Sequence, residues 1–249
     1  MLEVKNISKQ IEGKNIIKSL HFTIQPGQIV GLLGPNGAGK TTTIKLLLGL
    51  LSPTLGDIIA DSVSLLTNKK QYLKKMGYVP DEPFFYEELK GIEFLRFTID
   101  LWGKGLYDRD YSEKLMQHLK VDSFIDQPIH TYSFGMKKKL ALLISLIHQP
   151  KYLMMDEPFN GLDPFTTHNI KNFLQAYATW GNGVLLSTHM LDVAEKFCTH
   201  IAIINSGNLI IFDEIKNIRS HDGDVSLEKY FIDTIIEEEN REEESKINE

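Results

Sequence analysis

The chain has 249 residues, of which 42% are hydrophobic and 24% are charged, and its formal net charge is -6 at pH 7. This length allows one or two globular domains with a large core, and the lack of a basic surplus argues against a nucleic-acid partner. The single cysteine, Cys198, excludes an internal disulfide framework and fits a reducing compartment.

The first part of the chain predicts two antiparallel strands, then a buried strand and a helix. Apolar and polar residues alternate imperfectly over residues 2–8 and cleanly over residues 20–24, which is the period of a half-buried strand. An apolar run over residues 28–33 predicts a buried strand, and the pattern of residues 40–51 predicts a helix.

A glycine-rich segment, GPNGAGKTT at residues 34–42, joins that buried strand to that helix. Two glycines ahead of Lys40 and Thr41 have the spacing of a phosphate-binding loop, in which backbone N–H groups converge on phosphate oxygens at a helix N-terminus. Lys40 can reach the β- and γ-phosphates, and the Thr41 hydroxyl can bind Mg²⁺. The predicted nucleotide-binding residues are Gly34, Pro35, Asn36, Gly37, Ala38, Gly39, Lys40, Thr41 and Thr42.

The middle of the chain changes from mixed to helical patterns. Residues 57–60 and 76–80 predict short strands, and residues 69–75 between them predict a helix. From residue 81 to residue 149 the periodicity is helical, so we predict an inserted helical subdomain there. Its predicted helices lie around residues 89–102, 111–119 and 140–147.

Strands and helices alternate again in the rest of the chain, which predicts an α/β fold with a mainly parallel sheet. Predicted strands cover residues 151–156, 183–188, 200–205 and 208–212, and predicted helices cover residues 166–180 and 190–198. We predict a single domain over residues 1–236. It comprises an α/β core at residues 1–80 and 150–222, the helical subdomain, and a C-terminal helix at residues 224–236. An acidic tail at residues 237–249 is expected to be disordered.

Two neighbouring carboxylates suggest the chemistry of the site. Asp156 ends a predicted buried strand, where a carboxylate must be paired or bound to metal, and Mg²⁺ held by Thr41 is a natural partner. Glu157 follows it and can orient and polarise an attacking water. Without the phosphate loop, an ordinary acidic turn would be the favoured interpretation of this pair.

Further motifs, in order along the chain, resemble those of the ATPase subunit of ABC transporters, and the resemblance runs from about residue 2 to residue 236. The phosphate loop resembles the Walker A motif of that family. The Asp156-Glu157 pair resembles Walker B and its catalytic glutamate. The other matching motifs are the signature motif at residues 133–136, the D-loop at residues 160–163 and the switch histidine motif at residues 187–189.

The resemblance implies a P-loop NTPase core that hydrolyses ATP with Mg²⁺, with Glu157, His189 and Lys40 in catalytic roles. It also implies that Ser133 and Gly135 cap the γ-phosphate of ATP bound to another copy. Asp163 would then hold the two copies in register. The implied partners are a second ATPase subunit, expected to be identical, and an integral membrane permease. The chain would be cytoplasmic, held at the inner face of the cell membrane by that permease.

The sequence departs from the family pattern at Ile11 and Asp81, and in the signature motif at Phe134 and Met136, where glycine and glutamine are usual. The signature departures leave Ser133 and Gly135 in place. Ile11 stands where the family usually has an aromatic residue that stacks on adenine, so we expect weaker base discrimination. Asp81 stands at the glutamine of the family's Q-loop. Because aspartate can bind Mg²⁺ but cannot donate an amide hydrogen bond, we predict Asp81 as a third metal ligand beside Thr41 and Asp156.

Several alternatives stay open at this point. The sequence of the Walker A motif and that of residues 226–231 resemble those of bacterial exporter subunits, which favours an exporter ATPase. The alternative function is a soluble ABC ATPase without a membrane partner. A phosphate-loop kinase gives no reason for the signature motif or His189. Phe84, Phe85 and Tyr86 are either docking contacts or core residues. The three lysines at residues 137–139 are expected to form a solvated face.

Overall fold

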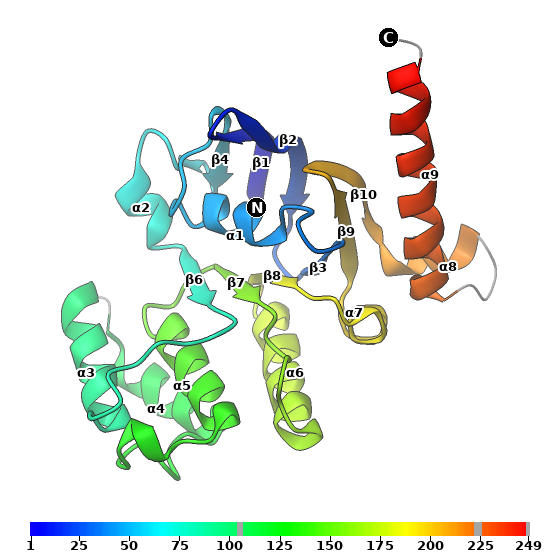
Figure 1. The fold of residues 1–249 in the computed structure, drawn as a ribbon. Helices are drawn as coiled ribbons and strands as arrows, with labels where there is room; N and C mark the ends of the chain where they lie inside the picture. The colour runs from blue at the N-terminus through cyan, green and yellow to red at the C-terminus, as the bar shows by residue number, and fades with distance from the viewer. Residues whose placement is uncertain (104–106, 222–225, 248–249) are drawn as a thin grey trace.

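The computed structural model describes residues 1–103, 107–221 and 226–247. The described chain forms two sheets, a block of helices, and further helices outside that block (Figure 1). Up to the helical block the elements are β1 (Leu2–Ile11), β2 (Lys14–Ile24), β3 (Ile29–Leu33), α1 (Lys40–Leu47), β4 (Leu55–Ala60), β5 (Val63–Ser64), α2 (Lys69–Leu73) and β6 (Met76–Val79). The helical block contains α3 (Gly91–Trp102), α4 (Arg109–Leu119), a 3-10 helix (Ile129–Thr131) and α5 (Phe134–Leu146). The rest comprises β7 (Tyr152–Asp156), α6 (Pro164–Thr179), β8 (Gly183–Ser187), α7 (Leu191–Phe197), β9 (His200–Asn205), β10 (Asn208–Glu214), α8 (Ile215–His221) and α9 (Leu227–Ile247).

The two sheets differ in strand direction. The N-terminal sheet has the order β2-β1-β4-β5 and is antiparallel throughout. The larger sheet has the order β10-β9-β3-β8-β7-β6 and is parallel except for the β9–β10 hairpin. This arrangement confirms the predicted α/β class with an antiparallel N-terminal region and a mainly parallel sheet.

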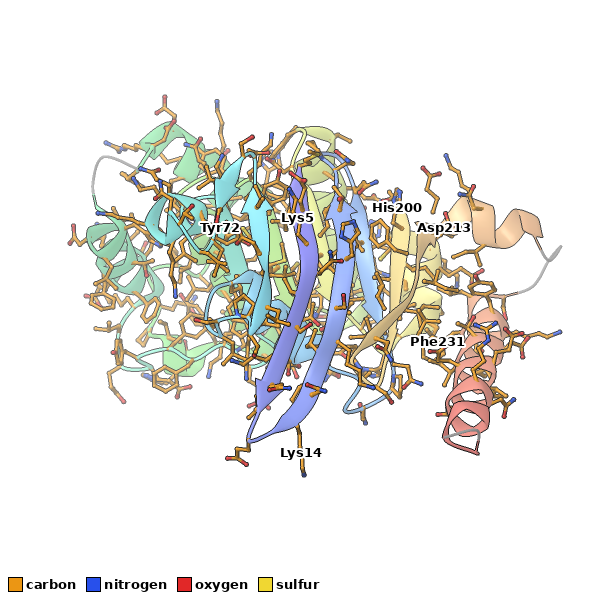
Figure 2. The ribbon with its side chains drawn as sticks, turned by 90° about the horizontal axis from the view of Figure 1, so that it is seen from above. Lys5, Lys14, Tyr72, His200, Asp213 and Phe231 are labelled. Carbon is orange, nitrogen blue, oxygen red and sulfur yellow. The ribbon has the colours of Figure 1, made fainter. Side chains whose placement is uncertain are left out.

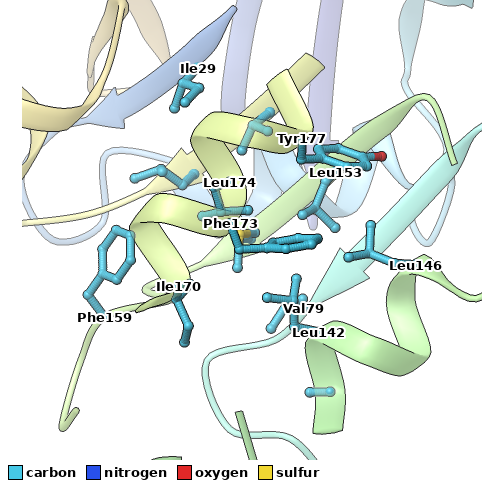
Figure 3. Packing of buried hydrophobic residues seen from close by; sticks show 14 of the residues in the cluster. Ile29, Val79, Leu142, Leu146, Leu153, Phe159, Ile170, Phe173, Leu174 and Tyr177 are labelled. Carbon is cyan, nitrogen blue, oxygen red and sulfur yellow. The ribbon is translucent and has the colours of Figure 1, made fainter. Parts of the chain in front are cut away.

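The parallel sheet is covered on both faces, which explains why β3, β7 and β8 are buried at every position. On β8, Leu185 joins a cluster beneath the antiparallel sheet and α1, whereas Val184 and Leu186 join the cluster formed with α5, α6 and α7. Figure 3 shows the second cluster, where Phe173 of α6 lies between the sheet and α5. The period-two alternation of side chains therefore feeds two cores from one sheet.

The two ends of the parallel sheet carry different helical additions. The helices α3, α4 and α5 lie near the β6 edge, and α9 stands beyond the opposite, β10 edge (Figure 1). Figure 2 shows the same separation from above, with Phe231 on α9 and Asp213 on β10 at one end of the molecule. No helix within residues 1–103, 107–221 and 226–247 has the length and apolar character needed to cross a bilayer.

The C-terminal segment differs from the expected disordered tail, because α9 continues to Ile247. Arg241 lies 3.8 Å from carboxylate oxygens of both Glu237 and Glu238, four and three residues earlier, and such pairs support a helix. The expectation of disorder rested on composition alone, which does not take into account that Arg241 follows two glutamates at helical spacing. The start of the predicted helix at residue 224 and the last two residues, 248 and 249, lie outside the described residues.

Candidate functional site

The parallel sheet brings three functional segments to one edge. The strands β3, β8 and β7 are neighbours and run in the same direction, so the segments that follow them meet at their carboxyl ends. These segments are the phosphate loop after β3, His189 after β8 and Glu157 after β7. The phosphate loop and Glu157 border a cleft of about 330 Å³, whose lining residues are Ile16, Asn36, Gly37, Gly39, Lys40, Thr41, Thr42, Asp81, Asp156 and Glu157. His189 is outside this lining and contacts Glu157.

Glycines in the phosphate loop are required by crowding as well as by backbone shape. A Cβ atom on Gly34 would overlap the carbonyl oxygen of Ile204 in β9. Gly39 has a φ of 108°, and a Cβ atom there would lie 2.6 Å from Cδ1 of Ile17 in β2. The loop is therefore wedged against both sheets, which fixes the direction of its backbone N–H groups before any ligand arrives.

Lys40 folds back over its own loop. Its Nζ donates to the carbonyl oxygen of Gly34 at 2.6 Å and to that of Pro35 at 3.1 Å. Burial lowers the pKa of Lys40, while the nearby carboxylates of Glu157 and Asp156 act in the opposite direction. The ammonium group is thus held at the cleft by weak neutral acceptors that a phosphate oxygen can replace.

Asp156 is a buried carboxylate with both oxygens engaged. The Thr41 hydroxyl donates to Oδ2 at 3.2 Å, and the Ser187 hydroxyl donates to Oδ1. Oxygen ligands from one hydroxyl and one carboxylate suit Mg²⁺, which usually completes its shell with phosphates and water. Among the residues that the structure describes, no group of three or more His, Cys, Asp or Glu side chains could hold a metal unaided. The site therefore fits Mg²⁺ bound together with a nucleotide.

Glu157 is held by its backbone and by its side chain. It has a φ of +43°, unusual for a residue with a Cβ, and its N–H donates to Oγ of Ser187 at 3.1 Å. Its Oε2 lies 3.0 Å from Nδ1 of His189, which is 61% exposed. Because an ionised carboxylate can only accept, Nδ1 carries the hydrogen in this contact. Two residues predicted to be catalytic are therefore in direct contact.

The residues of the signature motif and D-loop lie elsewhere. In the described part of the chain, the cleft lining does not include Ser133, Gly135 or Asp163. Ser133 caps α5, accepting the N–H of Met136 at 3.3 Å, and Asp163 caps α6. Hydrogen bonding with Thr166 lowers the pKa of Asp163. The structure thus places these residues at two helix N-termini outside the Lys40 cleft.

Three residues that line or support the cleft were missed from the sequence. Ile16 lines the cleft, whereas Ile11 is 40% exposed and outside the lining. Ser187 links Asp156 to Glu157, and its position at the end of a buried parallel strand was the available signal. Lys138 is buried, so the expectation of a solvated lysine face is wrong at that position. Burial lowers the pKa of Lys138, and Asp81 opposes this effect.

Comparison with known proteins identifies the chemistry of this cleft. A family model described as "ABC transporter" matches residues 17–160, more than half of the chain. The chain belongs to the ABC transporter family of ATP-binding proteins. ATP is therefore its nucleotide, and ATP hydrolysis coupled to transport is its enzymatic class.

The alignments with individual relatives extend over most of this chain. It is 36% identical over 218 residues to the uncharacterized ABC transporter ATP-binding protein YhcH of Bacillus subtilis, covering 87% of this chain and 71% of that protein. It is 30% identical over 241 residues to the lantibiotic transport ATP-binding protein SrtF of Streptococcus pyogenes, covering 97% and 100%. A solved structure of an ABC transporter ATP-binding subunit superposes with a TM-score of 0.85 at 30% identity, covering 94% of this chain and 99% of that chain. The predicted membership of the ABC transporter family is confirmed.

Proposed function

We propose that this ABC ATPase hydrolyses ATP in the Lys40 cleft and uses the energy to drive export by a separate membrane-spanning permease. The observation that carries the proposal is the convergence of Lys40, Thr41, Asp156 and Glu157 on one cleft. Relatives such as SrtF, which is named for lantibiotic transport, support the assignment to export.

Each side chain at the cleft has a distinct task. The N–H groups of the phosphate loop and Lys40 bind the β- and γ-phosphates, with Lys40 exchanging its present carbonyl contacts for phosphate oxygens. Thr41 and Asp156 hold Mg²⁺, which when bound neutralises charge on the phosphates. Asp81 lines the same cleft and is a further candidate ligand.

Glu157 is the proposed general base. It orients a water for in-line attack on the γ-phosphate and accepts its proton. His189, which contacts Glu157 here, supplies a hydrogen bond to the γ-phosphate when nucleotide is bound. The contact between them keeps Glu157 at the mouth of the cleft until the phosphate is present.

A second copy completes the proposed site. Ser133 and Gly135 are at the start of α5, outside the Lys40 cleft, and Ser133 is exposed. A helix N-terminus with free N–H groups and a hydroxyl suits a γ-phosphate presented by another chain. We therefore propose a head-to-tail dimer of two identical chains with ATP between them, with Asp163 near the contact.

The permease docks on the helical block in this proposal. Phe84 is 82% exposed and Tyr86 is 54% exposed, whereas Phe85 is buried against Phe94. The two exposed rings are the proposed docking contacts, and Phe85 is a core residue. The chain would then lie at the cytoplasmic face of the membrane through its partner, without contact to nucleic acid.

The permease is tested by purifying the protein from membranes in mild detergent and identifying the chains that accompany it. We expect one integral membrane protein in a fixed ratio, and the variant Phe84→Ser/Tyr86→Ser should lose it. A protein that stays free of membrane partners in this experiment would favour the soluble ABC ATPase instead.

A further inference from the structure

A buried lysine lies directly behind the cleft. Lys138 of α5 is only 1% exposed, and its side chain extends from the helical block toward the ends of two sheet strands. Its Nζ lies 3.2 Å from the carbonyl oxygen of Pro80 and 3.4 Å from that of Glu157. It also lies 3.5 Å from Oδ1 of Asp81.

These contacts are made to adjacent strand ends. The strands β6 and β7 pair in parallel, with Val79 opposite Met155. Pro80 and Asp81 leave the sheet immediately after β6, and Glu157 leaves it immediately after β7. The Lys138 ammonium therefore bridges the two chain segments that enter the cleft from this side of the sheet.

The peptide at Glu157 is held from two directions as a result. Its N–H donates to Ser187, and its carbonyl accepts from Lys138 and from the N–H of Asn160 at 3.2 Å. These hydrogen bonds maintain the left-handed backbone of Glu157, whose φ is +43°. Because this backbone sets where the side chain points, its hydrogen bonds determine whether the carboxylate reaches its place beside His189.

Burying an ammonium group at this location has an unfavourable free energy. Burial of a charge is unfavourable unless strong hydrogen bonds and an opposite charge compensate, and an apolar side chain would fill the space at lower cost. The carboxylate of Asp81 and two strand-end carbonyls provide the compensation here. Packing alone therefore does not explain a lysine at this position.

We propose that Lys138 is a positioning residue for ATP hydrolysis, acting through the backbone of Glu157 and the side chain of Asp81. It does not touch the nucleotide, because it lies behind the lining of the cleft. The same residue ties α5, the helix that begins after Ser133, to the catalytic side of its own chain. The inference rests on the proposed role of Glu157 as the general base.

Lys138→Met removes the charge and the hydrogen bonds while keeping an unbranched side chain. Displacement of the base by a fraction of an ångström to one ångström is expected to lower kcat about 10- to 100-fold. The KM for ATP should change by less than about threefold, because the phosphate loop is untouched. Lys138→Gln keeps N–H donors without the charge and should recover part of the rate.

A lysine one position earlier on the same helix supplies the matched control. Lys137 is paired with Glu87 rather than with any strand end at the cleft. We expect Lys137→Gln to leave kcat and KM unchanged. The number of ATP sites per chain, measured by calorimetric titration, gives the fraction of folded protein, so a rate loss can be expressed per functional site.

A double-mutant cycle separates positioning from general destabilisation. Combined with Glu157→Gln, Lys138→Met should lower the single-turnover rate by less than about twofold further, because the base it positions is already absent. A double variant whose single-turnover rate falls by the product of the two single-variant losses would contradict the inference. So would a kcat per site within about twofold of wild type for both Lys138→Met and Lys138→Gln. A Glu157→Gln protein that hydrolyses ATP normally would instead overturn the proposed base and, with it, this inference. If Lys138→Met does not fold, Lys138→Gln completes the same cycle.

Discussion

The phosphate loop and the start of α5 are both helix N-termini with glycine and hydroxyl residues, yet they are built differently. The loop is wedged against Ile204 and Ile17, and its Thr41 is bonded to Asp156 across the sheet. The start of α5 exposes Ser133, whose hydroxyl oxygen accepts the N–H of Met136 in its own helix. The first region is preorganised by its own chain, and the second presents its polar groups outward.

This difference suggests how the work of binding is divided. A preorganised loop pays little ordering cost when phosphate binds, so it can hold ATP on a single chain. In the proposed dimer, the exposed helix N-terminus outside that cleft acts on the ATP that is bound to the other chain. On this view, nucleotide binding belongs to one chain and hydrolysis to a pair of chains.

The largest expected effect comes from Glu157→Gln. Removal of the general base should lower kcat by about 10²- to 10⁴-fold while ATP still binds to the phosphate loop. The protein should then accumulate as an ATP-bound dimer. ATPase rates, nucleotide titration and size-exclusion chromatography with light scattering measure the three properties.

A monomer that turns over ATP at the normal rate after this change would refute the role of Glu157. The matched control is Glu195→Gln, on α7, outside the lining of the Lys40 cleft. It should leave turnover and oligomeric state as in wild type.

Subunit mixing is the sharpest test of the division between the two regions. Lys40→Ala and Ser133→Asp should each lower ATPase activity by about 10²-fold or more, the first by weakening phosphate binding and the second by placing a negative charge against the γ-phosphate. In a mixed dimer, one site would combine Lys40 of one chain with Ser133 of the other, both unchanged. Mixing the two inactive proteins should therefore restore activity.

The expected recovery is about a quarter of wild-type activity if chains pair at random and sites act independently: half of the dimers are mixed, and each has one intact site out of two. Titrating one variant into the other gives the recovery curve. No recovery at any ratio, with both variants folded, would place Lys40 and Ser133 in one chain's site and remove the reason for a dimer.

A smaller effect is expected at the base of the nucleotide. The cleft lining in the described chain contains Ile16 and no aromatic residue. Ile11 is outside this lining but belongs to the same β1–β2 hairpin as Ile16, and a longer aromatic side chain there is expected to reach the base. Ile11→Tyr should therefore improve ATP affinity about 2- to 10-fold, which corresponds to the ~0.5–1.5 kcal/mol of an aromatic stacking contact. Titrations with ATP and GTP on wild type and variant measure it. Unchanged affinity for both nucleotides would show that residue 11 does not reach the base.

The sequence predicted the first region better than the second for a physical reason. The phosphate loop is a local motif, and its strand, glycines, Lys40 and Thr41 are consecutive. The burial of Lys138 depends on carbonyl groups 58 and 19 residues away in the chain, which no local pattern reveals. Its neighbours Lys137 and Lys139 made it resemble a solvated run, although it shares a helix face with the buried Leu142, four residues on.

Asp81 is a second residue for which the sequence predicted the position but not the partner. The sequence indicated a carboxylate at a loop that enters the site, and the structure places it at the cleft. Its ion pair with Lys138 could not be foreseen, because the pairing depends on how the helical block meets the sheet. The presence of a carboxylate at the cleft was predictable from the local sequence, whereas its contact with a side chain of the helical block was not.

The smallest expected effect separates two uses of Ser133. As an N-cap, its hydroxyl stabilises α5, so Ser133→Ala should lower the free energy of unfolding by about 1 kcal/mol, whereas Ser133→Asp retains a capping oxygen and should stay within about 0.5 kcal/mol of wild type. ATPase activity should instead be lower in Ser133→Asp than in Ser133→Ala, because aspartate repels a γ-phosphate whereas alanine only omits a contact. Urea unfolding and ATPase rates on the same preparations measure both orders. If stability and activity instead fall together, with alanine worse than aspartate in each, the hydroxyl acts only as a helix cap, and the start of α5 has no role in binding the nucleotide of another chain.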